Sequence, residues 1–207
     1  MSRSQNSSLQ RYYGAVWFIS NLSSLLTVGA NTLVIIAFIT NKQLRTINNY
    51  LIINLAVADF IVGLVSMNFY TAYIVMQGWS FGPYVCDAWL TLDYVASNTS
   101  VMNLLIICID RYLSVTFPVK YRNKRKVLHA KLAMLFAWVV SFVLWAPWII
   151  GWQYIVKTVP PNDCYIQFIQ DGQLMSVITT LAAFYLPACV MVILYYKVYV
   201  GLQKRAK

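Results

Sequence analysis

One aspartate, Asp93, stands deep in an apolar stretch that runs from Leu92 to Tyr112 and ends in the triplet Asp110-Arg111-Tyr112. An ionised carboxylate in hydrocarbon is costly unless a partner compensates its charge. No Lys or Arg lies in the middle of an apolar stretch of this chain. We therefore expect the partner of Asp93 to come from outside the chain, as a ligand or an ion.

The neighbours of Asp93 follow from helical geometry, because residues three, four and seven positions further on share its face. Ser97 and Ser100 then lie one and two turns deeper, and Asn98 flanks them. A carboxylate ringed by aromatic faces suits a quaternary or protonated amine, which gains ion pairing and cation–π attraction of about 0.5 to 2 kcal/mol per ring. The alternative is that the aromatic residues mark the membrane interfaces and that Asp93 bonds to an internal donor. The aromatic residues concerned are Tyr94, Trp145 and Phe184, with Tyr70 and Tyr73 nearer the outer end.

Asp59 is a second acid in an apolar segment, and with Asn31 and Ser100 it could form a polar centre. Oxygen ligands of this kind suit a hard cation such as sodium. The alternative is a hydrogen-bonded acid that burial keeps neutral, and the sequence favours neither. No other metal and no cofactor are expected.

The triplet Asp110-Arg111-Tyr112 lies about 25 Å further along the same helix than Asp93, at 1.5 Å per residue. An arginine at such a helix end can pair with its neighbour or be offered to a partner. One rigid element thus links a ligand site to a basic face, as a transmembrane signal requires. The basic loop 120–131 has a simpler interpretation, which is anchoring on the cytosolic side.

The elements that position these residues are apolar runs. Hydrophobic residues make up 60% of the chain and charged residues 11%, against about a quarter charged in soluble domains, and the mean hydropathy is +0.62. Runs of this length can cross a bilayer core of about 30 Å. We predict an all-α membrane protein whose five spans lie at about residues 14–40, 47–76, 83–115, 132–151 and 172–201.

The basic residues predict the orientation in the membrane. Thirteen of the sixteen fall on one side of the predicted spans, and only Arg3, Arg11 and Lys157 fall on the other. By the positive-inside rule the N-terminus is expected outside the cell and the C-terminus in the cytosol. The net charge of +10 is thus a topology signal in a plasma-membrane protein and does not indicate nucleic-acid binding.

Residues 1–13 are predicted to be an extracellular tail. They have no apolar core and no cleavage site of small residues, so they are not expected to be a cleavable signal peptide. Asn6-Ser7-Ser8 is an acceptor sequence for N-glycosylation on the predicted outer side. Similar triplets at Asn21 and Asn98 lie within spans and are discounted.

The four cysteines divide by their place in this topology. Cys86 and Cys164 face the same oxidising compartment and can pair, which would pin the outer loop over the bundle. The alternative is that both are buried free thiols. Cys108 and Cys189 fall in the inner half of the membrane, where free thiols pack as small apolar groups.

Landmarks spread along the whole chain resemble those of the rhodopsin-like G-protein-coupled receptors. Their order and spacing together are highly specific. The landmarks are Gly29-x-Asn31, Leu55-Ala56-x-Ala58-Asp59, Cys86, Asp110-Arg111-Tyr112, Trp138 and Pro187.

Within that group the chain is similar to the muscarinic acetylcholine receptors, close to the level of a subfamily. The segments that carry this likeness are Ser66-Met67-Asn68-x-Tyr70-Thr71, Leu92 to Asn98, Ser100 to Ile106, Leu144-Trp145-Ala146-Pro147 and Ala182 to Pro187.

The resemblance implies a site for acetylcholine and coupling to a heterotrimeric G protein near Arg111. Asp93 would pair with the choline ammonium, and Tyr94 and Trp145 would form the aromatic walls around it. A synaptic location of the protein would fit this ligand. The span-three side would be completed by Ser97 and Asn98, and the span-five side supplied by Thr179, Ala183 and Phe184. The resemblance also implies that Cys86 pairs with Cys164 in the outer loop.

Two positions depart from the pattern of close vertebrate relatives, which indicates a divergent member of the group. Ser176 stands where threonine is expected, and Ile169 stands where leucine or phenylalanine is expected. Both belong to the implied ligand site, and both changes are mild, so they should tune affinity more than abolish binding.

A larger departure is the number of spans, since the chain has five where the group has seven. Residues 14–207 would then form part of a seven-helix domain, without the sixth and seventh helices. We expect such a chain to bind ligand poorly by itself, which radioligand binding can test. A related hypothesis is a truncated regulatory form that holds the full-length receptor in inactive complexes.

Two further classes fit the sequence less well. An ion-coupled transporter could place Asp59 and Asp93 in a polar pathway, but such proteins show repeated halves and no internal repeat is present here. An enzyme is not expected, because the only histidine, His129, falls in a basic loop with no carboxylate or thiol placed to work with it. We interpret that histidine as a solvated loop residue.

Overall fold

The computed structural model describes residues 3–156, 159–160, 162–170 and 172–206, and within these ranges it is helical without strands. The side chains of residues 3–8, 122, 153–154, 170 and 204–206 fall outside that description. The long helices are α1 (Arg3–Thr40), α2 (Ile47–Ile61), α3 (Met67–Val75), α4 (Pro83–Thr116), α6 (Val127–Ile155), α8 (Gln173–Thr180) and α9 (Leu186–Ala206). The short ones are α5 (Pro118–Lys124), α7 (Gln167–Gln170) and a 3-10 turn at Lys42–Leu44.

Five helical segments of the described chain are long and apolar enough to cross a membrane, so the prediction of an all-α protein with five spans is confirmed. These segments are Leu9–Thr40, Ile47–Val75, Pro83–Thr116, Val127–Trp152 and Gln173–Gln203.

Two helices begin earlier than the predicted spans. The helix α1 begins at Arg3, because residues 3–13 contain no Gly or Pro that would break it. The helix α6 begins at Val127, where the His129 ring nitrogen Nδ1 accepts a hydrogen bond of 3.3 Å from the Lys126 N–H and caps the helix. His129 is therefore an exposed residue of the first helical turn, and its interpretation as a loop residue was wrong.

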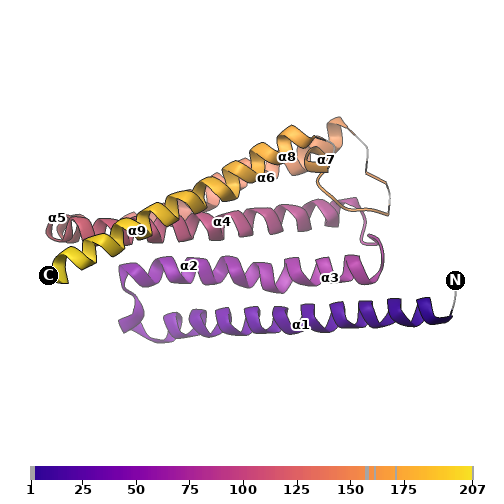
Figure 1. Ribbon diagram of the computed structural model, residues 1–207, viewed down its shortest axis with the longest axis horizontal. Helices are drawn as coiled ribbons and strands as arrows, with labels where there is room; N and C mark the ends of the chain where they lie inside the picture. The colour runs from indigo at the N-terminus through magenta and orange to yellow at the C-terminus, as the bar shows by residue number, and fades with distance from the viewer. Residues whose placement is uncertain (1–2, 157–158, 161, 171, 207) are drawn as a thin grey trace.

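The helix α4 lies at the centre of the bundle and packs against α2, α6 and α9, while α1 packs against α2 and α3 (Figure 1). Buried amides tie these helices together. The Asn103 side chain of α4 donates to the Leu51 carbonyl of α2 at 2.7 Å, and the Trp138 indole of α6 donates to Asn54 of α2 at 2.9 Å. Such interhelical hydrogen bonds help to hold helices together in lipid, where the hydrophobic effect does not.

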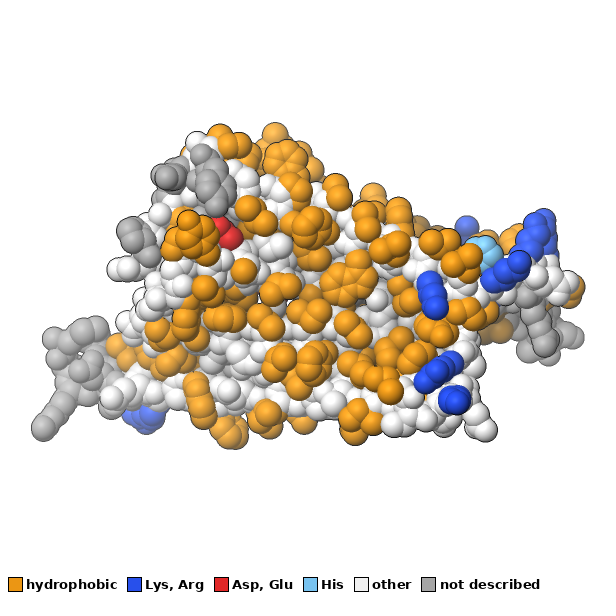
Figure 2. Space-filling view, turned by 180° about the vertical axis from the view of Figure 1, so that it is seen from behind, with side chains coloured by type: hydrophobic (Ala, Val, Ile, Leu, Met, Phe, Trp, Pro, Cys, Tyr) orange, Lys and Arg blue, Asp and Glu red, His pale blue; other side chains and the backbone are white. Residues whose placement is uncertain are grey.

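The two ends of the bundle differ in chemistry. The turn between α1 and α2, the helix α5 and the C-terminus lie at one end, and the N-terminus, the turn between α3 and α4 and the helix α7 lie at the other (Figure 1). Hydrophobic side chains cover the length between them, and most of the visible Lys and Arg side chains gather at the end that carries α5 and the C-terminus (Figure 2). This is the pattern of a membrane-spanning bundle with one basic face.

Two spans contain a wider π-helical turn, η2 (Val62–Ser66) and η3 (Leu181–Tyr185). A π turn leaves backbone carbonyls without their usual partners. In η2 the Gly63 carbonyl accepts from the Ser24 hydroxyl at 2.8 Å, and the Ser66 carbonyl accepts from the Trp89 indole at 3.3 Å. η3 ends just before Pro187, whose missing N–H and bulky ring already weaken the regular helix there. Both turns lie beside the site described next.

Candidate functional site

A cavity of about 280 Å³ opens among α4, α6 and the π turn η3. One face of α4 supplies most of its wall, because side chains four residues apart stand above one another. The lining residues are Asp93, Tyr94, Ser97, Asn98 and Val101 of α4, Trp145 of α6, and Ala183 and Phe184 of η3.

Asp93 is the one acid in this lining, and it is half-buried. The hydroxyl groups of Ser97 and Ser66 lie beside its carboxylate. Within the described residues no Lys, Arg or His forms an ion pair with it. The cavity thus offers a carboxylate that has no cationic partner among the described residues.

Aromatic faces stand next to the carboxylate. The rings of Tyr94 and Trp145 lie 4.7 Å apart between centroids and are tilted by 51°. Phe184 is more than half exposed and contacts Tyr185 edge to face at 5.5 Å. Tyr70 and Tyr73 do not line the cavity. The aromatic wall therefore consists of Tyr94 and Trp145 on one side and Phe184 on the other.

Two polar atoms of the lining are buried without a hydrogen-bond partner among the described residues, the Trp145 indole N–H and the Asn98 amide oxygen. The other end of the Asn98 amide donates to the Ser141 hydroxyl at 2.9 Å. The two ends of an amide can be exchanged by a flip, since the hydroxyl can also donate. Both atoms are covered by their neighbours, so small shifts of these two lining side chains would be needed to bring one or two N–H donors to a bound molecule.

Three residues predicted for the ligand site lie outside this cavity. Thr179 lines a neighbouring groove between α6 and α8, and its hydroxyl donates to the Met175 carbonyl at 2.7 Å. Ile169 packs against the buried core near the disulfide, and Ser176 lies in α8, where its carbonyl accepts from the Thr180 hydroxyl at 2.7 Å. The ligand-binding role of all three stays a prediction.

Two residues near Asp93 were not predicted as part of the site. Val101 follows Asp93 and Ser97 at intervals of four residues, so helical periodicity could have found it. Ser66 comes from η2, and a contact between separate spans leaves no signal in the spacing of residues along one of them.

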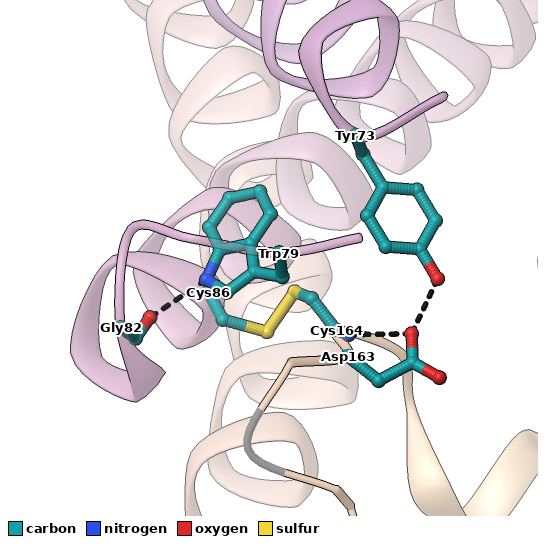
Figure 3. Close-up of a disulfide and its surroundings, with 6 residues drawn as sticks. All are labelled: Tyr73, Trp79, Gly82, Cys86, Asp163 and Cys164. Carbon is teal, nitrogen blue, oxygen red and sulfur yellow. Dashed lines mark hydrogen bonds between the residues drawn. A yellow bond between two sulfur atoms is a disulfide. The ribbon is translucent and has the colours of Figure 1, made fainter. Parts of the chain in front are cut away.

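The outer loop is held over this end of the bundle by a disulfide between Cys86, in the first turn of α4, and Cys164 (Figure 3). The predicted pairing is confirmed, with the two Cα atoms 5.8 Å apart. The Asp163 carboxylate accepts hydrogen bonds from the Tyr73 hydroxyl and, at 2.9 Å, from the Cys164 N–H. Nearby, the backbone N–H of Trp79 donates to the Asn162 carbonyl, and its indole N–H donates to the Gly82 carbonyl. Cys108 and Cys189 are free thiols, the first buried and the second exposed.

The predicted polar centre is formed in part. The Ser100 hydroxyl of α4 donates to the Asp59 carboxylate of α2 at 2.8 Å. The Asn31 amide instead donates to the Thr27 carbonyl of its own helix at 2.9 Å. No group of three or more His, Cys, Asp or Glu side chains that could hold a metal occurs in the described ranges. Sodium binding at Asp59 stays a prediction.

At the basic end of α4, Asp110 pairs with Arg125 at 2.5 Å and accepts a hydrogen bond of 2.8 Å from the Tyr121 hydroxyl. The pKa of Tyr121 is raised to about 12, by burial first and then by its hydrogen bond to Asp110. Arg111 is exposed, and the Tyr112 ring lies 5.8 Å from the Lys197 ammonium of α9.

Sequence reasoning missed Tyr121 and Arg125, because α5 folds back onto α4 and only the third dimension brings them to Asp110. The loop 120–131 is therefore more than a run of anchoring charges. The acceptor Asn6 has its side chain outside the described residues.

Comparison with known proteins places this geometry in a class. A profile described as "7 transmembrane receptor (rhodopsin family)" matches residues 30–207. The chain belongs to that family, and it is accordingly a multi-pass protein of the plasma membrane.

Its similar relatives are muscarinic acetylcholine receptors. The chain is 50% identical over 192 residues to the muscarinic acetylcholine receptor M3 of Sus scrofa and to that of Rattus norvegicus, which covers 92% of this chain and 32% of each relative. It is 50% identical over 191 residues to the receptor M5 of Saimiri boliviensis boliviensis, covering 91% of this chain and 36% of the relative. The chain thus spans about a third of the length of these relatives.

Proposed function

We propose that this chain forms the ligand-binding part of a muscarinic-type receptor, which takes acetylcholine or a related quaternary amine from outside the cell and signals through a heterotrimeric G protein. The observation that carries the proposal is the Asp93 carboxylate, which has no cationic partner among the described residues and lies beside the paired rings of Tyr94 and Trp145.

The chemistry of the cavity matches a choline ester. A quaternary ammonium has no N–H to donate, so it is held by charge and by the faces of aromatic rings rather than by hydrogen bonds. Asp93 supplies the charge and Tyr94 and Trp145 supply the faces. The Trp145 indole N–H and a flipped Asn98 amide then supply donors for an ester carbonyl.

This function needs the cavity end of the bundle to face the cell exterior, and the chemistry of the two ends supports that orientation. The disulfide lies at the end near the cavity, and disulfides persist in the oxidising space outside the cell. Most of the visible Lys and Arg side chains gather at the opposite end, as the positive-inside rule expects for the cytosol (Figure 2). The N-terminus would then be extracellular and the C-terminus cytosolic.

Signalling would use the other end of the helix that carries the ligand acid. The helix α4 is one continuous element from Pro83 to Thr116, so a shift imposed at Asp93 is carried to Arg111. Arg111 is exposed and does not pair with its neighbour Asp110, which is paired with Arg125. An exposed arginine at a basic cytosolic face is available to a protein partner.

Binding of acetylcholine to the chain in nanodiscs built from lipids without choline headgroups tests the proposal. Saturation-transfer NMR suits the measurement because it detects weak binding. Asp93→Asn should weaken the binding at least tenfold. Asp59→Asn removes the same charge from a position outside the cavity and should leave the binding largely intact. Equal binding by the wild type and Asp93→Asn would contradict the proposal.

A further inference from the structure

A second hollow, of about 210 Å³, lies between α6 and α8. Leu144 and Trp148 of α6 form one side, and Met175 and Ile178 of α8 form the other. All four side chains are apolar and substantially exposed, and they lie within helices apolar enough to span a membrane, so we take the bilayer to be their surroundings. We call this hollow the α6–α8 groove.

The groove adjoins the cavity that holds Asp93. Trp145 and Ala183 line both spaces, so one layer of side chains separates them. Trp145 is only 7% exposed and its indole N–H has no partner in the described chain. Ala183 contributes only a methyl group to the partition. Ala183 is therefore the smaller of the two side chains that the cavity and the groove share.

The two spaces are complementary in charge and polarity. The cavity holds a carboxylate, whereas none of the described residues that line the groove is charged. The one hydroxyl of the groove, on Thr179, is already bonded to the backbone carbonyls of Met175 and Ser176. A molecule that matches both spaces has a cationic head and an apolar tail.

We propose that the α6–α8 groove is a second subsite, which receives the apolar tail of a cationic amphiphile whose ammonium head lies at Asp93. The tail crosses the partition at Ala183 and reaches the bilayer between Leu144 and Ile178. The inference rests on the proposed ammonium site and extends it to ligands that partition into the membrane. Small choline esters fill the cavity alone, and alkylammonium ions fill both spaces.

The test uses octyltrimethylammonium with a photoreactive diazirine at the end of its tail. The full chain is placed in nanodiscs built from lipids without choline headgroups, and covalent adducts are mapped by mass spectrometry. We expect adducts on Leu144, Met175 and Ile178, and we expect excess tetramethylammonium to remove them because it competes for Asp93.

Three variants make the test specific. Asp93→Asn removes the anchor of the head group and should lower the labelling of the groove at least tenfold. Ala182→Phe fills the groove without touching the cavity and should do the same. Leu181→Phe places the same ring at the adjacent exposed residue, which lines neither space. The groove of this variant should be labelled as strongly as that of the wild type. Formation of the Cys86–Cys164 disulfide and the helical circular dichroism report whether each variant is folded.

Groove labelling that is unchanged in Asp93→Asn would overturn the proposal, because it would mean that tails enter from the bilayer without an anchored head. Adducts confined to the cavity or absent from α6 and α8 would also overturn it. Binding of tetramethylammonium to the wild type, followed separately by saturation-transfer NMR, tells the two ideas apart. If it binds and the groove is not labelled, only the second subsite fails; if it does not bind, the ammonium site fails as well.

Discussion

Asp110 forms its ion pair with Arg125, at the end of α5, while its immediate neighbour Arg111 faces the solvent. Arg125 also donates to the Asn48 side chain of α2, so one guanidinium joins α5 to two spans. The acid of the triplet Asp110-Arg111-Tyr112 thus joins α4 to α5, whereas its arginine is exposed.

This division of roles predicts opposite behaviour for two arginines. Arg125→Ala leaves the buried Asp110 carboxylate without its cation, and breaking a buried pair in this way costs about 3 kcal/mol. The Tm of the chain in nanodiscs should fall by several degrees. Arg111→Ala removes the same side chain from an exposed position and should change the stability by no more than about 0.5 kcal/mol. Equal losses of Tm in the two variants would contradict this assignment.

The Tyr121 hydroxyl predicts a pH dependence. Burial and the hydrogen bond to Asp110 raise its pKa from 10.0 to about 12 in the folded chain. The folded state then holds this proton more tightly than the unfolded state does. The resulting stabilisation is complete below pH 10 and is lost as the pH rises toward 12. Across that window the Tm of the wild type should fall more steeply than that of Tyr121→Phe, which has no hydroxyl proton to lose. Tyr12→Phe, at an exposed position of α1, serves as the control, and parallel curves for the wild type and Tyr121→Phe would count against the prediction.

The packing of α1 depends on Gly63 in the π turn η2. A Cβ added there would lie 3.0 Å from the Thr27 Cγ2 and 3.2 Å from the Val28 Cγ2. Gly63→Ala should therefore push α1 away and lower the stability by about 1 to 3 kcal/mol. Gly29→Ala is the matched control, because nothing lies within 4 Å of its added Cβ and alanine favours the helix.

The same contact can be tested by rescue. Thr27→Ser removes the Cγ2 methyl group that the new Cβ would meet, so it should restore part of the Tm lost in Gly63→Ala. A double variant that is no more stable than Gly63→Ala would show that the loss has another cause.

The spans could be predicted from the sequence because long apolar runs are a local signal, and residues that share a helix keep a fixed spacing. Asp93, Ser97 and Asn98 were therefore placed on one wall of the cavity. The π turns η2 and η3 left no such signal, since they arise from the packing of neighbouring helices and from the proline that follows η3.

The position of Thr179 shows the effect of η3 on the site. A π turn inserts an extra residue into the helical repeat, so the face presented before η3 is not the face presented after it. Thr179 precedes η3 and lines only the groove, whereas within η3 Ala183 lines both spaces and Phe184 lines only the cavity. The family resemblance alone grouped Thr179 with Ala183 and Phe184, and the regular spacing of helical residues does not show which of the two spaces each one lines.

We expect the Trp145 indole N–H to make the cavity bind acetylcholine more tightly than tetramethylammonium. This N–H is buried without a hydrogen-bond partner among the described residues, and an indole nitrogen can only donate. Acetylcholine has an ester carbonyl to accept this bond, and tetramethylammonium has none. Trp145→Phe keeps an aromatic face but loses the N–H. The affinity for acetylcholine should fall about 5- to 12-fold more than the affinity for tetramethylammonium, as the loss of a hydrogen bond worth roughly 1 to 1.5 kcal/mol requires.

Paired titrations by saturation-transfer NMR measure the ratio of the affinity for acetylcholine to the affinity for tetramethylammonium. Any general weakening of the aromatic cage affects both affinities and cancels from this ratio. Trp148→Phe is the matched control, because Trp148 lines the α6–α8 groove but not the cavity, so its ratio should equal that of the wild type. A ratio unchanged in Trp145→Phe would mean that the indole N–H does not bind the ester. The flipped Asn98 amide is the other side-chain N–H donor among the described cavity residues and would be the next candidate.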